Sequence, residues 1–176
     1  MPELPEVETI RLGLEKYLVG HTIERIEVRL PKMFLGNPKL GEGASVTGAR
    51  RFGKGLIIDL DNSHSIAVHV KMTGQLIYKG PASKVSVSQK AGGALPNNST
   101  HVMFHLDKNT QLFYNDIRQF GWIKLVKTAD VSSLPFFKEL GPEPFRDLDY
   151  ATFTKILSKK KSPIKPLLMD QKVISG

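Results

Sequence analysis

Two carboxylates directly follow a proline at the start of the chain. If Met1 is removed, Pro2 becomes the N-terminus and carries a free secondary amine. α-Amino groups titrate near ~7.7–8.0 and lysine side chains near about 10.4, so part of this amine is unprotonated and nucleophilic at neutral pH. Such an amine attacks a carbonyl or acetal carbon and leaves an iminium. Glu3 and Glu6 are close enough in sequence to move protons for this chemistry.

The same stretch also predicts the start of a helix. Proline is tolerated in the first helical turn, and acids are favoured there by the helix dipole. From Pro5 to Val19 the apolar residues fall at spacings of three and four, as on one face of an amphipathic helix. A capped helix N-terminus is therefore an alternative interpretation of these residues. The local sequence supports it as well as it supports a nucleophile.

Short alternating segments after this helix predict strands. They cover residues 26–30, 45–51, 56–60, 66–72, 102–106, 112–114 and 122–126. Strands of this length and spacing indicate an antiparallel sandwich or barrel. Residues 31–43 are predicted to form a loop. The segment Lys79–Ser99, rich in Ser, Gly, Lys and Asn, is predicted to form a long loop of the kind that is usually functional or mobile.

The composition changes after Leu134, where we divide the chain into residues 1–134 and 135–176. Residues 140–145 break regular structure, and Tyr150–Lys161 is predicted to be a helix with a cationic end. A further helix is predicted to begin at residues 162–163 and to run into residues 173–174. The second part is therefore a connector followed by a helical module.

The chain is basic and contains no cysteine. Lys and Arg outnumber Asp and Glu by 25 to 17 over 176 residues, a net charge of +8. This balance favours a polyanionic partner, either nucleic acid or an acidic membrane surface. Without cysteine the chain holds neither a disulfide nor a thiolate zinc site. It has no apolar signal core and no run of transmembrane length, so we expect a cytoplasmic protein.

Two clusters in the strand region carry residues that could contact a ligand. Lys54 lies between two glycines at the junction of two predicted strands, where the backbone can come close to a ligand, although a solvated basic turn is the alternative. His69 lies on the opposite side of its strand from Val68 and Val70. A histidine so placed is more often structural than a ligand, and Met72 at the strand tip is more often a core residue.

Two more clusters favour nucleic acid. Arg118 and Phe120 are two residues apart, so in extended backbone they point the same way. A cation beside an aromatic ring suits a wedge into a base stack, although a turn with a core Phe is the alternative. The lysine run 159–161 and Lys165 are suited to phosphates, or to partnering a helix C-terminus.

Taken together, these residues resemble the bacterial formamidopyrimidine-DNA glycosylases. The opening PELPEVET, residues 2–9, is similar to the N-terminal signature of that family. Further matches run in order through residues 50–55, 69–74, 114–121, 140–144 and 159–172. The resemblance implies an α+β fold: a two-layered antiparallel β-sandwich flanked by an N-terminal helix, followed by the start of a helix–two-turn–helix DNA-binding module.

The resemblance also implies an activity. The enzyme would flip a damaged purine, such as 8-oxoguanine or a formamidopyrimidine, out of the duplex and excise it. Pro2 would attack the deoxyribose carbon that carries the base, and Glu3 would donate protons in base excision and ring opening. Glu6 would support the site, and Lys54 would donate a proton in strand cleavage by β-elimination.

DNA contacts follow from the same resemblance. Met72, Arg118 and Phe120 match the three residues that fill the space left by the flipped base. Arg118 and Lys161 match DNA-contact positions. In the same clusters we expect DNA contacts from His69, Lys71 and Lys165.

The chain departs from the family pattern at several positions. Ser99, two residues before His101, stands where the family has a DNA-contact histidine, which puts that contact in doubt. Ile117 replaces a common proline, and Gln119 a common basic residue. The family's four zinc ligands are absent, so we expect no cofactor in this chain and read it as an N-terminal catalytic portion without the zinc finger.

The partner expected is double-stranded DNA with an oxidised purine or an abasic site, bound by a monomer in the bacterial nucleoid and not at a membrane. Two alternatives stay open. A non-catalytic DNA-binding fragment would keep the fold but lack turnover, because contacts from the rest of the clamp would be missing and binding would weaken steeply with salt. The second alternative is a purely structural sandwich domain, which would require the structural interpretation to hold for every residue cluster described above.

Overall fold

The computed structural model describes residues 2–81, 93–159 and 161–175. Its helices are α1 (Leu4–Tyr17), α2 (Pro135–Lys138), α3 (Tyr150–Ser158) and α4 (Ile164–Met169). Its strands are β1 (Ile23–Val28), β2 (Phe34–Leu35), β3 (Val46–Phe52), β4 (Gly55–Leu60), β5 (His64–His69), β6 (Gly74–Lys79), β7 (Thr100–Leu106), β8 (Thr110–Asp116) and β9 (Trp122–Lys127).

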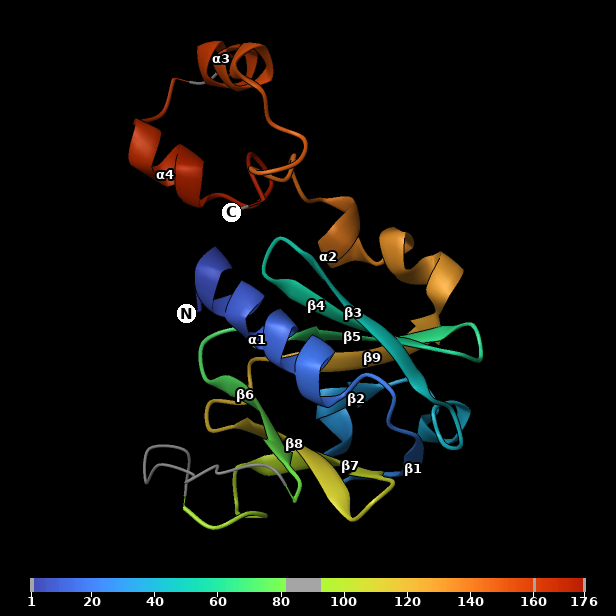
Figure 1. The fold of residues 1–176 in the computed structure, drawn as a ribbon. Helices are drawn as coiled ribbons and strands as arrows, with labels where there is room; N and C mark the ends of the chain where they lie inside the picture. Colours follow the sequence, from blue (N-terminus) through green and yellow to red (C-terminus); the bar gives the residue numbers. More distant parts are fainter. Residues whose placement is uncertain (1, 82–92, 160, 176) are drawn as a thin grey trace.

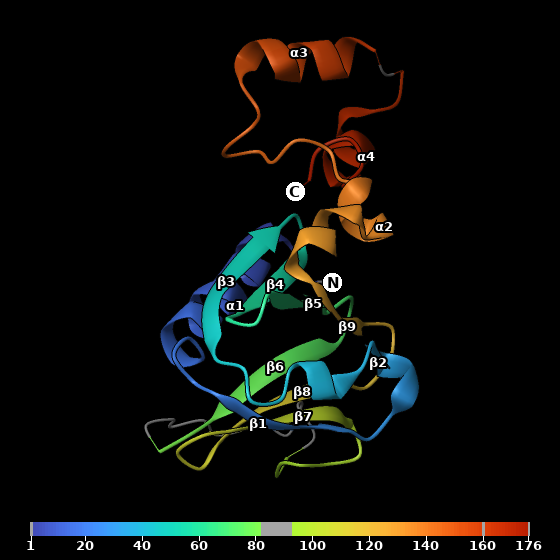
Figure 2. The same ribbon diagram turned by 90° about the vertical axis from the view of Figure 1, so that its right-hand side faces the viewer.

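The strands form two layers (Figures 1 and 2). One sheet has the order β1-β7-β8-β6, and the other has the order β2-β9-β5-β4-β3. Neighbouring strands are antiparallel except β2 and β9, which are parallel. The predicted α+β fold with a two-layered sandwich is confirmed, and the barrel alternative is excluded because each sheet has two edges.

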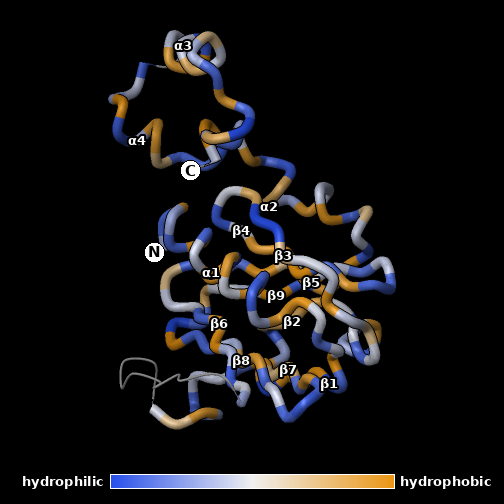
Figure 3. Tube along the Cα trace, in the orientation of Figure 1, coloured by the Kyte–Doolittle hydropathy of each residue, from blue (hydrophilic) through white to orange (hydrophobic). Residues whose placement is uncertain are grey.

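The main core lies between the two sheets. Alternate residues of the strands point inward, so Val68 of β5 and Phe104 of β7, from different sheets, belong to one continuous apolar cluster. Figure 3 shows hydrophobic segments along the strands and hydrophilic ones at the turns. The period of two that predicted the strands therefore reflects real burial on one face.

Helix α1 spans the open side between the sheets. Val7 and Leu14 belong to the core cluster, while the Arg11 guanidinium donates to the Ala49 carbonyl of β3 at 3.3 Å. At the other end of the helix, the Tyr17 ring stacks on Tyr78 of β6 with centroids 5.5 Å apart. Because the helix is held at both ends, its N-terminus and the residues before it have a defined position.

The outer face of the larger sheet is also covered. Ile57 and Ala67 pack against Val131 and Phe137, which lie on a 3₁₀ turn (Thr128–Ser133) and on α2. Strands β4 and β5 are therefore buried on both faces, and this segment after β9 packs on the sandwich. The division of the chain at residue 134 stays a prediction.

The C-terminal part of the chain holds a third, separate apolar cluster. Leu167, Val173 and Ile174 are buried against residues of α3 such as Phe153 and Ile156. In both ribbon views this helical module lies beyond the end of the sandwich at which α1 begins (Figures 1 and 2). The module meets the sandwich close to the turn that joins β3 and β4.

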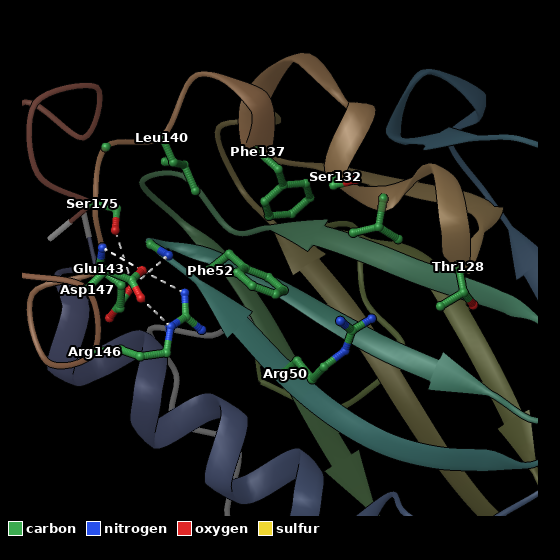
Figure 4. Close-up of a pocket in the computed structure, with 13 residues that line it drawn as sticks. Arg50, Phe52, Thr128, Ser132, Phe137, Leu140, Glu143, Arg146, Asp147 and Ser175 are labelled. Atoms are coloured by element: carbon green, nitrogen blue, oxygen red, sulfur yellow. Dashed lines mark hydrogen bonds and ion pairs between the residues drawn. The ribbon is translucent and has the colours of Figure 1, made fainter.

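Glu143 makes the main polar contact between module and sandwich. Its carboxylate accepts from the Arg51 guanidinium at 2.8 and 3.3 Å. It also accepts from the Gly53 N–H at 3.3 Å and from the Ser175 hydroxyl at 3.2 Å (Figure 4). Arg51 also donates to Glu8 of α1 at 2.7 Å. Burial disfavours the charged form of Glu8, but hydrogen bonds from Arg51 and Arg11 outweigh it and lower the pKa of this carboxyl.

Replacing Glu143 with alanine is expected to destabilise the fold. The change removes the acceptor of the Gly53 N–H and of the Arg51 Nη2 group, whereas Arg51 keeps Glu8 and the Gly53 carbonyl. We expect a loss of about 2 kcal/mol in the free energy of unfolding, below the ~3–5 kcal/mol typical of breaking a buried pair. Urea titration measures it, with the exposed Glu24→Gln as control. A loss no larger than that of the control would contradict the docking role of Glu143.

Two local expectations need correction. The final helix ends at Met169 instead of residues 173–174, because the Asp170 side chain accepts from the Lys172 N–H at 2.9 Å and turns the chain. The loop expected at 31–43 contains the short strand β2. The loop expected at residues 79–99 lies partly outside the described residues. None of the helices in the described ranges has the length and apolar character needed to cross a lipid bilayer.

Candidate active site

Lys54 lies in a two-residue turn between β3 and β4. Gly53 adopts φ +53°, a left-handed conformation that glycine takes without strain, and the chain reverses within this turn. The backbone N–H of Lys54 donates to the Gln171 side-chain oxygen at 3.1 Å. Although Lys54 is a cation, only 2% of it is exposed, so the solvated basic turn considered above is excluded.

The Lys54 ammonium is paired with Glu3 at the N-terminus of α1. The distance from its Nζ atom to a Glu3 carboxylate oxygen is 2.6 Å. Glu3 is the N-cap residue, and its own N–H donates to the Glu6 carboxylate at 2.6 Å. Pro2 is half-buried and directly precedes this pair. The structure therefore brings Pro2, Glu3, Glu6 and Lys54 to one place.

This arrangement serves both interpretations of the opening residues. Glu6 stabilises the helix start in the manner of a capping-box residue, and the same helix start fixes the position of Pro2. The helix dipole directs its positive end at the residues that precede α1. A nucleophilic amine with an adjacent carboxylate and ammonium can therefore form at the helix N-terminus without conflict with capping.

A second group of side chains gathers at two turns. The Arg118 guanidinium donates to the Met72 sulfur at 3.1 Å and lies over the Phe120 ring at 4.7 Å from its centroid. Met72 is 45% exposed and Phe120 is 54% exposed. The structure thus brings these three residues together, and it excludes the core alternatives for Met72 and Phe120. An exposed apolar pair around a cation is a surface that can insert into a stack of rings.

The geometry of this group differs from the one we predicted. Arg118 and Phe120 do not lie in extended backbone, because β8 ends at Asp116 and Gln119 adopts φ +56°. The two side chains meet across a turn instead of along a strand. The turn is tight at Gly121, where a Cβ atom would collide with the Tyr114 hydroxyl.

Asp116 fixes both turns, a role that the sequence did not reveal. It is fully buried, and one of its carboxylate oxygens accepts from the Thr73 hydroxyl and from the Arg118 N–H at 3.2 Å. The other oxygen accepts from the Gly121 N–H at 2.8 Å. One carboxylate therefore ties the turn that carries Met72 to the turn that carries Arg118 and Phe120.

Asp116→Asn is expected to loosen this connection. The amide nitrogen of Asn cannot accept from a backbone N–H, so one of the bonds to Arg118 or Gly121 is lost. We expect a loss of about 2 kcal/mol in the free energy of unfolding, typical of hydrogen bonds to a charged group. Amide hydrogen exchange should become faster at residues 118 and 121, with Thr73→Ser, which keeps the hydroxyl, as control. Unchanged exchange at both amides would contradict the role of Asp116.

His69 lies inside the protein. It is 1% exposed, its Nδ1 accepts from the Lys71 N–H at 3.0 Å, and its ring packs edge-on to Phe136 with centroids 4.5 Å apart. Burial, reinforced by the charges of Lys71 and Lys54, lowers the pKa of His69 to about 3, so the ring is neutral at physiological pH. A direct contact between His69 and a ligand would require neighbouring side chains to move. Its observed contact shapes the turn at Lys71, which adopts φ +50° and is half-buried.

The predicted lysines of the helical module lie on its surface. Lys161 precedes α4 and Lys165 lies in its first turn, and both are exposed. Lys160 lies outside the described residues. The positions of Lys161 and Lys165 allow contact with a long polyanion, and their contribution to binding stays a prediction.

A cavity of about 330 Å³ lies on the other side of the Lys54 turn, where Gly53 lines it, between β3 and the segment that leads into the helical module (Figure 4). Phe52, Phe137 and Leu140 supply its apolar wall, and Arg50 and Arg146 flank the Phe52 ring. Neither Pro2 nor Lys54 lines it, so we do not assign the chemistry to it. Among the described residues, no cluster of three or more His, Asp or Glu side chains could hold a metal ion.

The sequence of this chain is similar to those of known proteins. The model of the formamidopyrimidine-DNA glycosylase N-terminal domain family matches residues 1–123. The chain is 37% identical to formamidopyrimidine-DNA glycosylase of Heliobacterium modesticaldum and covers 63% of it. It is 41% identical to the protein of that name from Pelotomaculum thermopropionicum and covers 62% of it. All of this chain is aligned in both cases.

Solved structures agree with these sequence relationships. The Lactococcus lactis formamidopyrimidine-DNA glycosylase, non-covalently bound to DNA containing an AP site, matches 99% of this chain with a TM-score of 0.83 and 32% identity. The same bacterium's enzyme in complex with DNA containing N7-benzyl-Fapy-dG matches with a TM-score of 0.82. This chain covers 65% and 62% of those two chains, so it spans somewhat less than two thirds of its relatives.

Proposed function

Because the chain belongs to the formamidopyrimidine-DNA glycosylase family, whose N-terminal domain model matches residues 1–123, we propose that it excises oxidised purines from duplex DNA and cleaves the strand at the resulting site. The substrates proposed are 8-oxoguanine and formamidopyrimidines. The observation that carries the proposal is the ion pair of 2.6 Å between the buried Lys54 and Glu3, directly beside Pro2. Packing of the core does not require a charged ammonium group at this buried position.

Base excision begins at the free amine of Pro2. The nitrogen lone pair forms a bond to the deoxyribose C1′, and the bond from C1′ to the base breaks, with its electron pair leaving on the base. The proline nitrogen then loses its proton. Breaking the bond between C1′ and the ring oxygen yields an iminium, and Glu3 supplies the proton that this oxygen takes up. Glu6 holds the Glu3 backbone at 2.6 Å, which keeps the acid beside the amine.

Strand cleavage follows from the iminium. The iminium withdraws electrons, so C2′ gives up a proton to water, a double bond forms between C2′ and C3′, and the bond from C3′ to its phosphate oxygen breaks. The phosphate leaves with that electron pair, and its oxygen takes up a proton. Lys54 supplies the proton in this step, from a position where Glu3 can exchange protons with it over 2.6 Å. Water then adds to the iminium carbon and releases Pro2.

The exposed group formed by Met72, Arg118 and Phe120 suits the other half of the reaction. Once the damaged nucleotide is flipped out, the Met72 and Phe120 side chains fill the space in the stack, and Arg118 donates to the base left behind. The net charge of +8 favours contact with phosphates, to which Lys71, Lys161 and Lys165 contribute. We retain His69 as a DNA contact only if its ring is uncovered on binding.

An excision assay tests the proposal. The Met1-free chain is incubated with a labelled duplex that carries one 8-oxoguanine, and with the same duplex carrying guanine. We expect release of 8-oxoguanine, and strand breaks without alkali treatment, from the damaged duplex only. Binding to the damaged duplex without release of the base would instead favour a non-catalytic DNA-binding protein. If the chain neither releases the base nor binds the duplex, both functions are contradicted.

A further inference from the structure

The turn that carries Lys54 is held by residues far away in the sequence. The Lys54 N–H donates to the side chain of Gln171, 117 residues later in the chain, at 3.1 Å. The preceding Gly53 N–H donates to Glu143, also from the C-terminal part of the chain. Two successive N–H groups of a sandwich turn therefore find their acceptors outside the sandwich.

Gln171 is itself fixed by the helical module. Its backbone carbonyl accepts from the Gly141 N–H at 2.8 Å, and Val173 and Ile174, two and three residues further on, are buried in the apolar cluster of the module. Its side-chain oxygen is close to the turn on a second side as well, because a Cβ atom at Gly53 would lie 3.2 Å from it. The module thus presents one acceptor to the Lys54 backbone in a defined position.

We propose that Gln171 is a positioning residue that sets the place of the Lys54 ammonium beside Glu3. The Lys54 side chain is almost completely buried, so its direction is determined by the backbone from which it starts. Gln171 holds that backbone, and through it the docking of the helical module controls strand cleavage. The part of this inference that concerns cleavage rests on the function proposed above.

Substitutions at Gln171 test the positioning of Lys54 more cleanly than substitutions at Glu143, which also weaken the contact between the module and the sandwich. Removing the Glu143 carboxylate also deprives the buried Arg51 of a partner, and so disturbs α1 as well. Gln171→Met keeps the length of the side chain and removes the acceptor, whereas Gln171→Glu keeps an acceptor oxygen. Glu139→Gln is a matched control, because it breaks an exposed ion pair with Lys172 between the same segments without touching the turn.

Two measurements on each variant test the inference. With abasic duplex DNA and borohydride, the amount of trapped protein–DNA adduct reports attack by Pro2, and strand breaks without borohydride report elimination. We expect Gln171→Met to slow elimination about 10- to 100-fold, the scale of effect expected from a small misplacement of a catalytic group, with trapping within about twofold of the parent. Gln171→Glu and Glu139→Gln should both stay close to the parent.

The second measurement does not depend on catalysis. Amide hydrogen exchange at residue 54 should become at least about 10-fold faster in Gln171→Met and stay unchanged in Glu139→Gln, because only the first loses the acceptor. Unchanged exchange in Gln171→Met would overturn the inference, and so would equal losses of trapping and elimination. If the parent forms no adduct, the proposed function fails, while the exchange rate still decides whether the module holds the turn.

Discussion

A chain that keeps Met1 is expected to lose base excision by at least about 1000-fold, the scale seen when a covalent nucleophile is removed. The amide bond to Met1 draws the lone pair of the Pro2 nitrogen into resonance, so no amine is left to attack C1′. The fold should not change, because Pro2 precedes α1 and the helix start is fixed by Glu3 and Glu6. Release of 8-oxoguanine from duplex DNA measures the effect.

The control uses the same preparation. Removing Met1 with an aminopeptidase, followed by mass spectrometry to confirm the new N-terminus, should restore the activity. Full activity in a preparation shown to retain Met1 would place the nucleophile elsewhere in the molecule, and the role assigned to Pro2 would be wrong.

Lys54→Met is expected to lower strand cleavage by about 100- to 10 000-fold, the range typical of general acid–base catalysis. Methionine keeps much of the length and the apolar stem of the buried lysine, so the turn can still pack. Glu3 loses its partner, but its half-exposed side chain can be hydrated. Binding to abasic DNA should therefore change by less than about threefold, since most of the affinity comes from phosphate contacts elsewhere.

Cleavage and binding are measured on the same duplex, by denaturing gel and by fluorescence anisotropy. Lys39→Met is the matched control: this lysine is exposed and pairs with Glu42 at 2.7 Å, away from the site. A loss of cleavage in Lys54→Met that equals its loss of binding would contradict a role in elimination.

The local parts of this fold could be predicted from the sequence because their signals are local. The spacing of apolar residues predicted α1, and alternation predicted strands in both sheets, since one face of each is buried in the core. The two-residue strand β2 was missed, because two residues cannot display a period. The end of α4 was misplaced, because the turn at Asp170 depends on one side-chain hydrogen bond.

Site residues could be predicted only where the residue type itself indicates a chemical role. Pro2 with its adjacent acids, and the pair of Arg118 and Phe120, attracted attention for their chemical character. Nothing in the sequence indicated that Asp116 would fix two turns, since its partners Thr73 and Gly121 are recognised only once β5, β6, β8 and β9 are assembled.

Long-range contacts account for the rest of the site that could not be predicted from the sequence. The pairing of Glu3 with Lys54 joins α1 to the β3–β4 turn, and the contact of Gln171 with Lys54 spans almost the whole chain. Such contacts leave no periodic signal in the sequence. The resemblance to a known family selected Lys54 as functional, but only the structure showed what holds it in place.

Trapping with borohydride tests the central claim most directly. The Met1-free chain is mixed with duplex DNA that carries one abasic site, borohydride is added, and the adduct is digested and mapped by mass spectrometry. We expect a reduced, stable bond between the sugar carbon and the nitrogen of Pro2, and no adduct from the chain that retains Met1. An adduct mapped to a lysine, or no adduct from the folded, Met1-free chain, would contradict it.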